Sequence, residues 1–434
     1  MKTLYILLGA LLFLTACEND LDQFPDNIAS SNSLDDYSGV LNAAYYYQIG
    51  SATPLAVMGD FRADNAFMFE APYTEFDEFD ADLTVMDDQF FGPFYTALYK
   101  SILSANNVIE NSESEMEVGE AKFLRGLSYF KLVKVFGDVP VNLSATPSTT
   151  DPSILTRQPA DQVYDNVIIP DLEEAITTLD NSGLSDGRAT QIAAQALLGK
   201  VYVQRGDFSN AEAPLGAVVN GAAAAGIMLQ ENFVDIFGEA NDLNAEIIFA
   251  TQMSASIVDE YGFSEFWSWY GGLDTKSLNP LEQDLVDAFE ASPGDLRREV
   301  TIDTSVMASP KFPQTGGPDH DWIELRLGDI ILLYAETLNE NGNTAQAITF
   351  LNQIRNRAGL EDTTATSQSE VRQAIYDERR LELAFEGQRW FDLVRTNTVD
   401  EEMGQTINSN YYLFPIPVSE VLSSFGEITQ NEGY

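Results

Sequence analysis

The sequence predicts a mostly helical fold, with long helices as a scaffold and two irregular segments carried on it. Apolar residues recur at helical spacing along most of the 434 residues. Two pairs of these stretches are joined by Gly-Asp or Gly-Asn turns, which is typical of helical hairpins. The segments around 54–86 and 226–319 lack a sustained helical pattern. These three observations favour an α-helical class with functional loops over a sheet-based fold.

The first 16 residues are predicted to be a signal peptide. Lys2 gives a positive start, residues 4–14 are almost entirely apolar, and the run is too short to span a membrane. Cys17 is the only cysteine, and Leu14-Thr15-Ala16-Cys17 resembles a bacterial lipobox. We therefore expect lipidation at Cys17, a tether over 17–32 and a single domain over 33–434. The alternative is a chance cysteine beside an ordinary cleavage site.

Charge and cysteine content narrow the possible functions. The chain has 68 acidic and 23 basic residues, a net charge of −45, and its hydrophobic content of 44% indicates a globular protein. So acidic a surface excludes nucleic acid as a partner and disfavours strongly anionic polymers. With Cys17 lipidated, the mature domain has no thiol for a disulfide or a cysteine-based metal site.

The helical stretches can be placed in order along the chain. Gly199 and Tyr202 fit part of the tetratricopeptide pattern, and Leu215 takes the aromatic position in the second helix of that pair. A related pair occurs near the C-terminus, so the copies are dispersed and the chain is not a plain solenoid. The alternative is two unrelated helical hairpins. Helices are expected over 33–49, 88–111, 116–136, 161–179, 190–205, 325–338, 344–358 and 377–395, with a strand-like run over 247–251.

Aromatic residues in the two irregular segments predict a ligand site. Loops this long usually carry function or are disordered, and these are too aromatic for disorder. Rings in a glycine-bounded loop could stack on sugar rings or contact peptides; the alternative is that they fill the underside of the loop. The candidate residues are Arg62, Asp64, Asn65 and Phe67 in the first segment, and Phe266, Trp267, Trp269 and Tyr270 in the second.

Recognisable catalytic motifs are missing from the sequence. His320 is the only histidine, so a histidine-based triad or zinc site is excluded or short of ligands. We expect no metal and no cofactor. In the charged 377–395 helix, an enzyme interpretation would use Glu378, Arg380 and Glu386. We favour a structural ion-pair network, with Arg379 and Glu382 paired at i,i+3.

Several long segments, in order, resemble the SusD/RagB family of Bacteroidetes outer-membrane lipoproteins. The acidic residues 18–22 behind Cys17 resemble the surface-export signal of such lipoproteins. The other matching segments are KFLRGLSYFKLVKVFGDVP (122–140), LRLGDIILLYAETLN (325–339), LNQIRNRAGL (351–360), YDERRLELAFEGQRWFDLVR (376–395), LFPIPVSE (413–420) and ITQNEGY (428–434).

The resemblance implies a fold and a function. The fold would be four tetratricopeptide-like helix pairs with a looped region carrying the ligand site. The protein would not be an enzyme. It would be lipid-anchored in the outer membrane, exposed on the cell surface, and would act as the lid of a SusC-like TonB-dependent transporter. The ligand would be an oligosaccharide or polysaccharide, neutral given the chain's acidity, or alternatively a peptide, as in RagB-like members. Trp267, Trp269 and Tyr270 would stack on it, with polar contacts from Arg62, Asp64 and Asn65.

Overall fold

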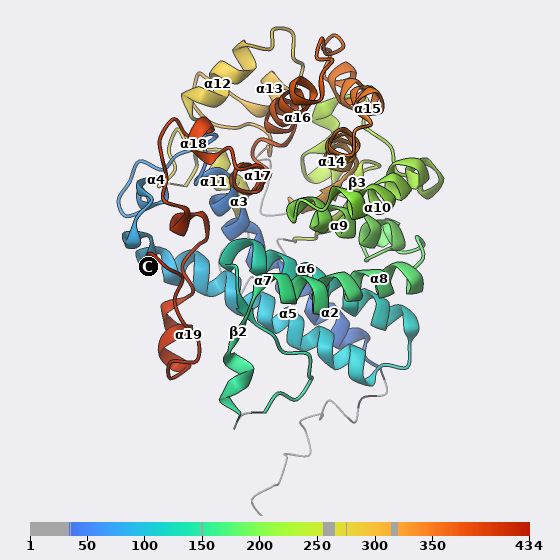
Figure 1. Ribbon diagram of the computed structural model, residues 1–434, viewed down its shortest axis with the longest axis vertical. Helices are drawn as coiled ribbons and strands as arrows, with labels where there is room; N and C mark the ends of the chain where they lie inside the picture. The colour runs from blue at the N-terminus through green and yellow to red at the C-terminus, as the bar shows by residue number, and fades with distance from the viewer. Residues whose placement is uncertain (1–33, 35, 149–150, 255–264, 275, 314–319) are drawn as a thin grey trace, which may run out of the picture.

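The computed structural model confirms the mostly helical class. It describes residues 34, 36–148, 151–254, 265–274, 276–313 and 320–434. Within these residues, helices predominate, and the strands form two small antiparallel sheets (Figure 1). No helix in the described part of the chain is both long enough and apolar enough to cross a membrane.

The N-terminal half contains the longest helices. Ser114 starts α6 by accepting a hydrogen bond from the Glu117 backbone N–H (3.3 Å), and Gly137, at φ +72°, ends it. The helices are α2 (Ser38–Tyr46), α3 (Ala52–Asp60), α4 (Glu75–Glu78), α5 (Gly92–Asn111), α6 (Glu115–Phe136), α7 (Ala160–Val163), α8 (Ile169–Thr178), α9 (Gln191–Gln204) and α10 (Phe208–Gly221). The shorter helical turns are η2 (Tyr47–Ser51), η3 (Ala81–Met86), η4 (Asp87–Phe91), η5 (Pro152–Leu155), η6 (Tyr164–Ile168), η7 (Leu184–Asp186) and η8 (Ala222–Ala225). The strands are β1 (Val139–Pro140) and β2 (Arg157–Gln158).

The C-terminal half starts from a buried two-stranded sheet. Strand β3 (Ile247–Thr251) has the bounds expected from the sequence and pairs antiparallel with β4 (Trp322–Arg326). The helices are α11 (Phe266–Tyr270), α12 (Gln283–Glu290), α13 (Arg298–Thr301), α14 (Leu327–Glu340), α15 (Thr344–Arg357), α16 (Gln368–Leu383), α17 (Arg389–Thr396), α18 (Val399–Glu402) and α19 (Val418–Ser423).

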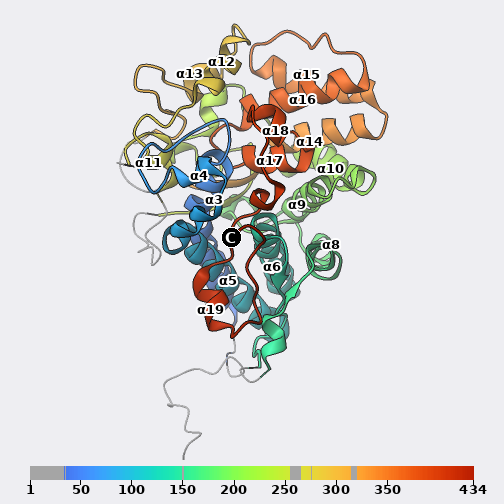
Figure 2. The ribbon, with the colours of Figure 1, turned by 60° about the vertical axis from the view of Figure 1, so that its left-hand side comes forward.

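Helix pairs build the scaffold. Helix α5 packs on α6, α9 on α10, and α14 on α15; contacts of α8 with α6 and α9, and of α10 with α14, join these pairs into one body (Figures 1 and 2). In the α9–α10 pair, a Cβ on Gly199 would lie only 2.4 Å from the Leu215 side chain. The two hairpins predicted from the sequence are therefore confirmed, whereas the number of four tetratricopeptide-like pairs stays a prediction.

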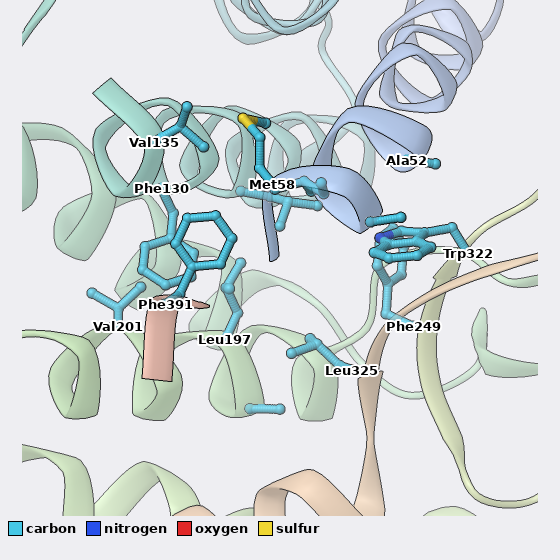
Figure 3. Packing of buried hydrophobic residues seen from close by; sticks show 14 of the residues in the cluster. Ala52, Met58, Phe130, Val135, Leu197, Val201, Phe249, Trp322, Leu325 and Phe391 are labelled. Atoms are coloured by element: carbon cyan, nitrogen blue, oxygen red, sulfur yellow. The ribbon is translucent and has the colours of Figure 1, made fainter. Parts of the chain in front are cut away.

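A continuous apolar core joins the helical layers to the β3–β4 sheet. Phe249 on β3 and Trp322 on β4 lie against this core, and Phe391 from α17 packs beside Phe130 and Leu197 (Figure 3). All five side chains are at most 5% exposed. Segments more than 200 residues apart in the chain thus share one interior.

Two expectations about local structure were wrong. The start of the 54–86 segment is the buried helix α3, so the irregular loop begins only after Asp60. The expected 377–395 helix is two helices, α16 and α17. Phe385 and Gly387 between them have positive φ angles of 63° and 67°, and a Cβ on Gly59 would lie 2.2 Å from the Gly387 carbonyl oxygen. The tight contact with Gly59 therefore fixes where the helix breaks.

Candidate functional site

Asp60, at the end of α3, holds the two predicted ligand loops together from inside. Its Oδ2 accepts hydrogen bonds from the Tyr270 hydroxyl (2.8 Å) and the Gly387 N–H (2.7 Å), and its Oδ1 accepts one from Asn65 Nδ2 (3.0 Å). Burial raises the pKa of Asp60 and that of Tyr270. Asn65 and Tyr270 thus have a structural hydrogen-bonding role in the interior.

Arg62 is fully buried and makes no contact with solvent. It donates to the carbonyl oxygens of Phe76 (2.7 Å) and Tyr411 (3.1 Å), and its guanidinium lies 4.3 Å from the centre of the Phe79 ring. Burial lowers the pKa of this guanidinium. Arg62 ties the first loop to the C-terminal segment by cation–π and hydrogen-bond contacts.

Asp64 is buried in an ion-pair cluster with α16 and α17. Its two oxygens accept hydrogen bonds from Arg389 Nε and Nη2, both at 2.7 Å, and Arg380 lies 2.9 Å away. Burial alone would raise the pKa of Asp64, but the contacts with Arg389 and Arg380 outweigh it and lower the pKa. The carboxylate therefore stabilises the fold.

Three of the four predicted aromatic side chains on α11 point into the core. Phe266 and Tyr270 are 0% exposed and Trp269 is 4% exposed. The Tyr270 ring stacks parallel to Phe61 at 5.9 Å between centres, and Trp269 packs edge-on against Phe90 at 5.5 Å. No face of these rings reaches solvent in this structure.

Six of the residues predicted to contact a ligand are buried in this structure, and their ligand contacts stay a prediction. The alternative stated above, that the aromatic rings fill the underside of the loop, describes α11. The residues concerned are Arg62, Asp64, Asn65, Phe266, Trp269 and Tyr270. Their sequence pattern was interpreted as a ligand site because loop aromatics and polar residues look alike whether they face solvent or the core.

The remaining predicted residues, Phe67 and Trp267, are half-buried. Phe67 N–H donates to the Pro280 carbonyl (2.9 Å), so the loop after α3 runs beside residues 280–281. Phe69 (50%) and Leu273 (60%) are exposed in these two segments. Trp267 lies in α11, with its ring centre 6.2 Å from that of His320. This loop surface, residues 66–73 with 267–274 and 276–281, presents apolar groups to solvent. Residues 262–264 of the predicted aromatic loop lie outside the described residues.

A hollow of about 250 Å³ opens elsewhere, between α2, the 186–188 turn and the end of β3. Tyr45 and Tyr46 line it, and Arg188 stacks on the Tyr45 ring at 4.2 Å. Arg188 is held by Glu120 (2.7 Å) and Asn42 (2.7 Å). Sequence reasoning missed this mixed aromatic and polar lining. The only signal was the Tyr45-Tyr46-Tyr47 run, which also fits an ordinary helix.

A second, more apolar hollow of about 350 Å³ lies along α5. Tyr95, Tyr99 and Leu103 form its floor, and Pro140 and Ile428 contribute to its walls. Leu103 is 40% exposed. Its lining offers few polar groups to orient a hydrophilic ligand.

The charged 377–395 segment forms the buried ion-pair network that the sequence predicted, but with different partners. Arg379 does not pair with Glu382; it binds Asp329 (2.7 Å) and Asp392 (3.1 Å) on other helices. Glu378 binds Arg297 (2.7 Å). The network links helices to one another and offers no exposed acid–base pair. His320 is buried, with its Nε2 2.7 Å from the Pro313 carbonyl oxygen.

Among the described residues, one group of three carboxylate side chains has the spacing of a metal site. Oxygens of Glu75, Asp80 and Asp82 lie within 4.8 Å of one another, on a solvated turn. Asp80 already caps η3 by accepting from the Asp82 N–H (2.8 Å). A capping interaction explains this geometry without a cation.

Comparison with known proteins adds independent evidence. Residues 13–203 match a family model described as "Starch-binding associating with outer membrane", and residues 300–410 match the SusD family model. A SusD-like protein P2 of Formosa agariphila is 25% identical, covering 80% of this chain and 81% of the relative. The starch-binding protein SusD of Bacteroides thetaiotaomicron is 23% identical over 77% and 76% of the two chains.

Solved structures share the fold over nearly the whole chain. A laminarin-binding SusD-like protein superimposes with a TM-score of 0.73 at 26% identity, covering 92% of this chain and 99% of the other. A SusD superfamily protein of Bacteroides thetaiotaomicron gives a TM-score of 0.76 at 24% identity, with similar coverage. The matched models, the relatives and the shared fold agree: this chain belongs to the SusD-like family.

Proposed function

We propose that this protein is a lipid-anchored, cell-surface glycan-binding protein of the outer membrane. It captures an oligosaccharide and delivers it to a SusC-like TonB-dependent transporter, over which it acts as a lid. The observation that carries the proposal is the SusD-like fold, which solved structures share over 92% of the chain. Relatives with this fold are named as starch-binding and laminarin-binding proteins.

Two features of the sequence support the anchor and the ligand class. Cys17, in Leu14-Thr15-Ala16-Cys17, is the proposed lipidation site, and its acyl chains would hold the protein at the membrane. The net charge of −45 favours a neutral glycan, because an anionic polymer would be repelled. Replacing Cys17 with serine should release the protein from the outer-membrane fraction.

We place the glycan on the loop surface, residues 66–73 with 267–274 and 276–281. Phe67, Phe69 and Trp267 supply the rings that reach solvent there, and aromatic faces stack on the apolar faces of sugar rings. Exposed apolar groups of this kind usually mark an interaction surface. The hollow beside Tyr46 is the competing location on this chain.

A non-enzymatic role fits the charged residues. The acidic groups that an enzyme interpretation would use, Glu378 and Glu386, are buried and paired with Arg297, Arg326 and Lys311. A general acid or base must reach the substrate. A peptide ligand is the alternative, and it would need a groove with backbone hydrogen-bond partners.

The test is a binding screen with the mature chain, residues 18–434, against laminarin oligosaccharides, starch oligosaccharides and mixed peptides, followed by calorimetry. Trp267→Ala and Phe69→Ala should each weaken glycan binding by about tenfold, about 1.4 kcal/mol. Tyr46→Ala, in the competing hollow, is the matched control and should bind normally. A loss confined to Tyr46→Ala would move the site to the hollow. Binding to peptides alone would refute the glycan proposal.

A further inference from the structure

Three lysines line a small cavity in an otherwise very acidic protein. The cavity, of about 20 Å³, lies between α6, α9, β4 and the 387–388 turn. Lys131 and Lys134 come from α6 and Lys200 from α9. Phe130 and Leu197 supply apolar walls in the region shown in Figure 3.

Two of these lysines have carboxylate partners. Lys131 is 2% exposed; it forms an ion pair with Glu324 and donates to Gln48 Oε1 (3.0 Å). Lys200 Nζ lies 2.7 Å from Asp329 Oδ2. Both ammonium groups are therefore compensated within the protein.

Lys134 differs from its two neighbours. It forms no ion pair or hydrogen bond with any residue that the structure describes. Its Nζ lies 4.1 Å from the centre of the Phe391 ring and 5.7 Å from that of Phe130. The electron-rich ring faces attract the ammonium but carry no net negative charge to balance it.

A count of the surrounding charges shows that the positive charge of Lys134 has no carboxylate to balance it. The cations that pair with carboxylates are Lys131, Lys200, Arg379 and Arg395, and the carboxylates are Glu324 on β4, Asp329 and Glu336 on α14, and Asp392 on α17. Four cations face four carboxylates, so a charged Lys134 is the fifth cation. Gln388, from the turn at the cavity wall, is neutral.

We propose that this cavity binds one small monovalent anion of halide size, with Lys134 as its principal partner and Lys131 and Lys200 on its flanks. An ion in this partly buried place would be weakly screened, so the attraction to the ammonium groups is stronger than at the surface. The volume of the cavity, about 20 Å³, suits a small ion.

Binding of the anion should depend on pH. Burial, helped by the charge of Lys200, lowers the pKa of Lys134 to about 7. The anion binds the protonated form, so the two events are linked and the anion raises this pKa. Between pH 6 and pH 8 the protonated fraction falls about tenfold, and the affinity for the halide should fall by the same factor.

The test compares thermal unfolding of the mature chain in sodium bromide and in sodium gluconate, at constant ionic strength, because gluconate is too large for the cavity. Bromide should stabilise the protein relative to gluconate at pH 6, and about tenfold more bromide should be needed for the same effect at pH 8. Lys134→Met keeps the length and the apolar contacts of the side chain, and it should abolish the difference in stability between bromide and gluconate. Lys276→Met, on the surface beside Asp274, is the matched control and should keep it.

Two results would overturn the proposal: equal stability in both salts at pH 6, or the same bromide effect in Lys134→Met as in the wild type. Crystals grown in bromide at pH 6 give a measurement that does not depend on the variants. An anomalous peak beside Lys134 Nζ is expected, and its absence in well-diffracting crystals would also count against the site.

Discussion

Replacing Arg326 with methionine should destabilise the protein strongly, because this arginine is shared by three buried carboxylates. It is 1% exposed and lies 3.0 Å from Glu246, 2.6 Å from Glu382 and 2.7 Å from Glu386. Removing one partner from a buried ion pair costs about 3–5 kcal/mol. Arg297, Arg357 and Lys311 still pair with these carboxylates, so we expect the lower end, about 3 kcal/mol.

The assay is urea unfolding followed by tryptophan fluorescence, with Arg298→Met as the control. Arg298 pairs with Glu299 at the surface (2.9 Å), and such pairs contribute about 0–1 kcal/mol. A loss for Arg326→Met no larger than that of Arg298→Met would refute the network's role.

The loss should also depend on pH. Burial alone would raise the pKa of Glu382, but the charges of Arg357 and Arg326 outweigh it and hold that pKa well below its usual value. The stabilisation is therefore complete above the unfolded pKa of about 4.3 and disappears as the pH falls through the folded pKa. The difference between wild type and Arg326→Met should stay constant between pH 7 and about pH 5 and should shrink as the pH falls below about 4.3. A difference that stays constant below this pH would contradict the electrostatic explanation.

Two further changes test packing and buried hydrogen bonding. Tyr270→Phe removes the hydroxyl that donates to Asp60 (2.8 Å) and should lower the free energy of unfolding by about 1–3 kcal/mol; a loss under about 0.5 kcal/mol would mean that water replaces the donor. Gly199→Ala places a methyl group 2.4 Å from Leu215 and should cost about 1–3 kcal/mol in urea unfolding, whereas Gly221→Ala, with nothing within 4 Å, should be neutral or slightly stabilising. Equal effects of the two alanines would argue against tight packing of α9 on α10.

Local signals predicted much of the helical scaffold. The expected helix over 116–136 is α6, and the expected strand over 247–251 is β3. Both could be predicted because helix caps, breakers and apolar spacing depend on only a few neighbouring residues. The break between α16 and α17 could not be predicted in this way. It depends on Gly387 meeting Gly59, a contact between residues 328 positions apart.

The candidate site was harder to predict for the same reason. Whether Trp269 or Tyr270 faces solvent depends on Phe61 and Phe90, which approach α11 only in the folded chain. The polar residues after α3 were misleading because a buried arginine or aspartate is favourable only when distant partners compensate it. Arg62 finds such a partner in the carbonyl of Tyr411. No local pattern in the sequence contains that information.

The contact of Arg62 with Tyr411 has a consequence for the order in which the chain acquires its structure. The two residues are 349 positions apart, and Asp64 likewise pairs with Arg389, which lies 325 positions further along the chain. Until almost the whole chain is present, the segment after α3 lacks these distant partners: Asp64 has no Arg389, and Arg62 has only local contacts, such as that with the Phe76 carbonyl. Folding of the N-terminal portion is thus completed only when the last 50 or so residues pack against it and supply these contacts. Such distant pairings slow folding, because the intervening chain must be brought together first. A chain truncated before residue 380 should expose the loop after α3 to proteolysis even though its first helices can form.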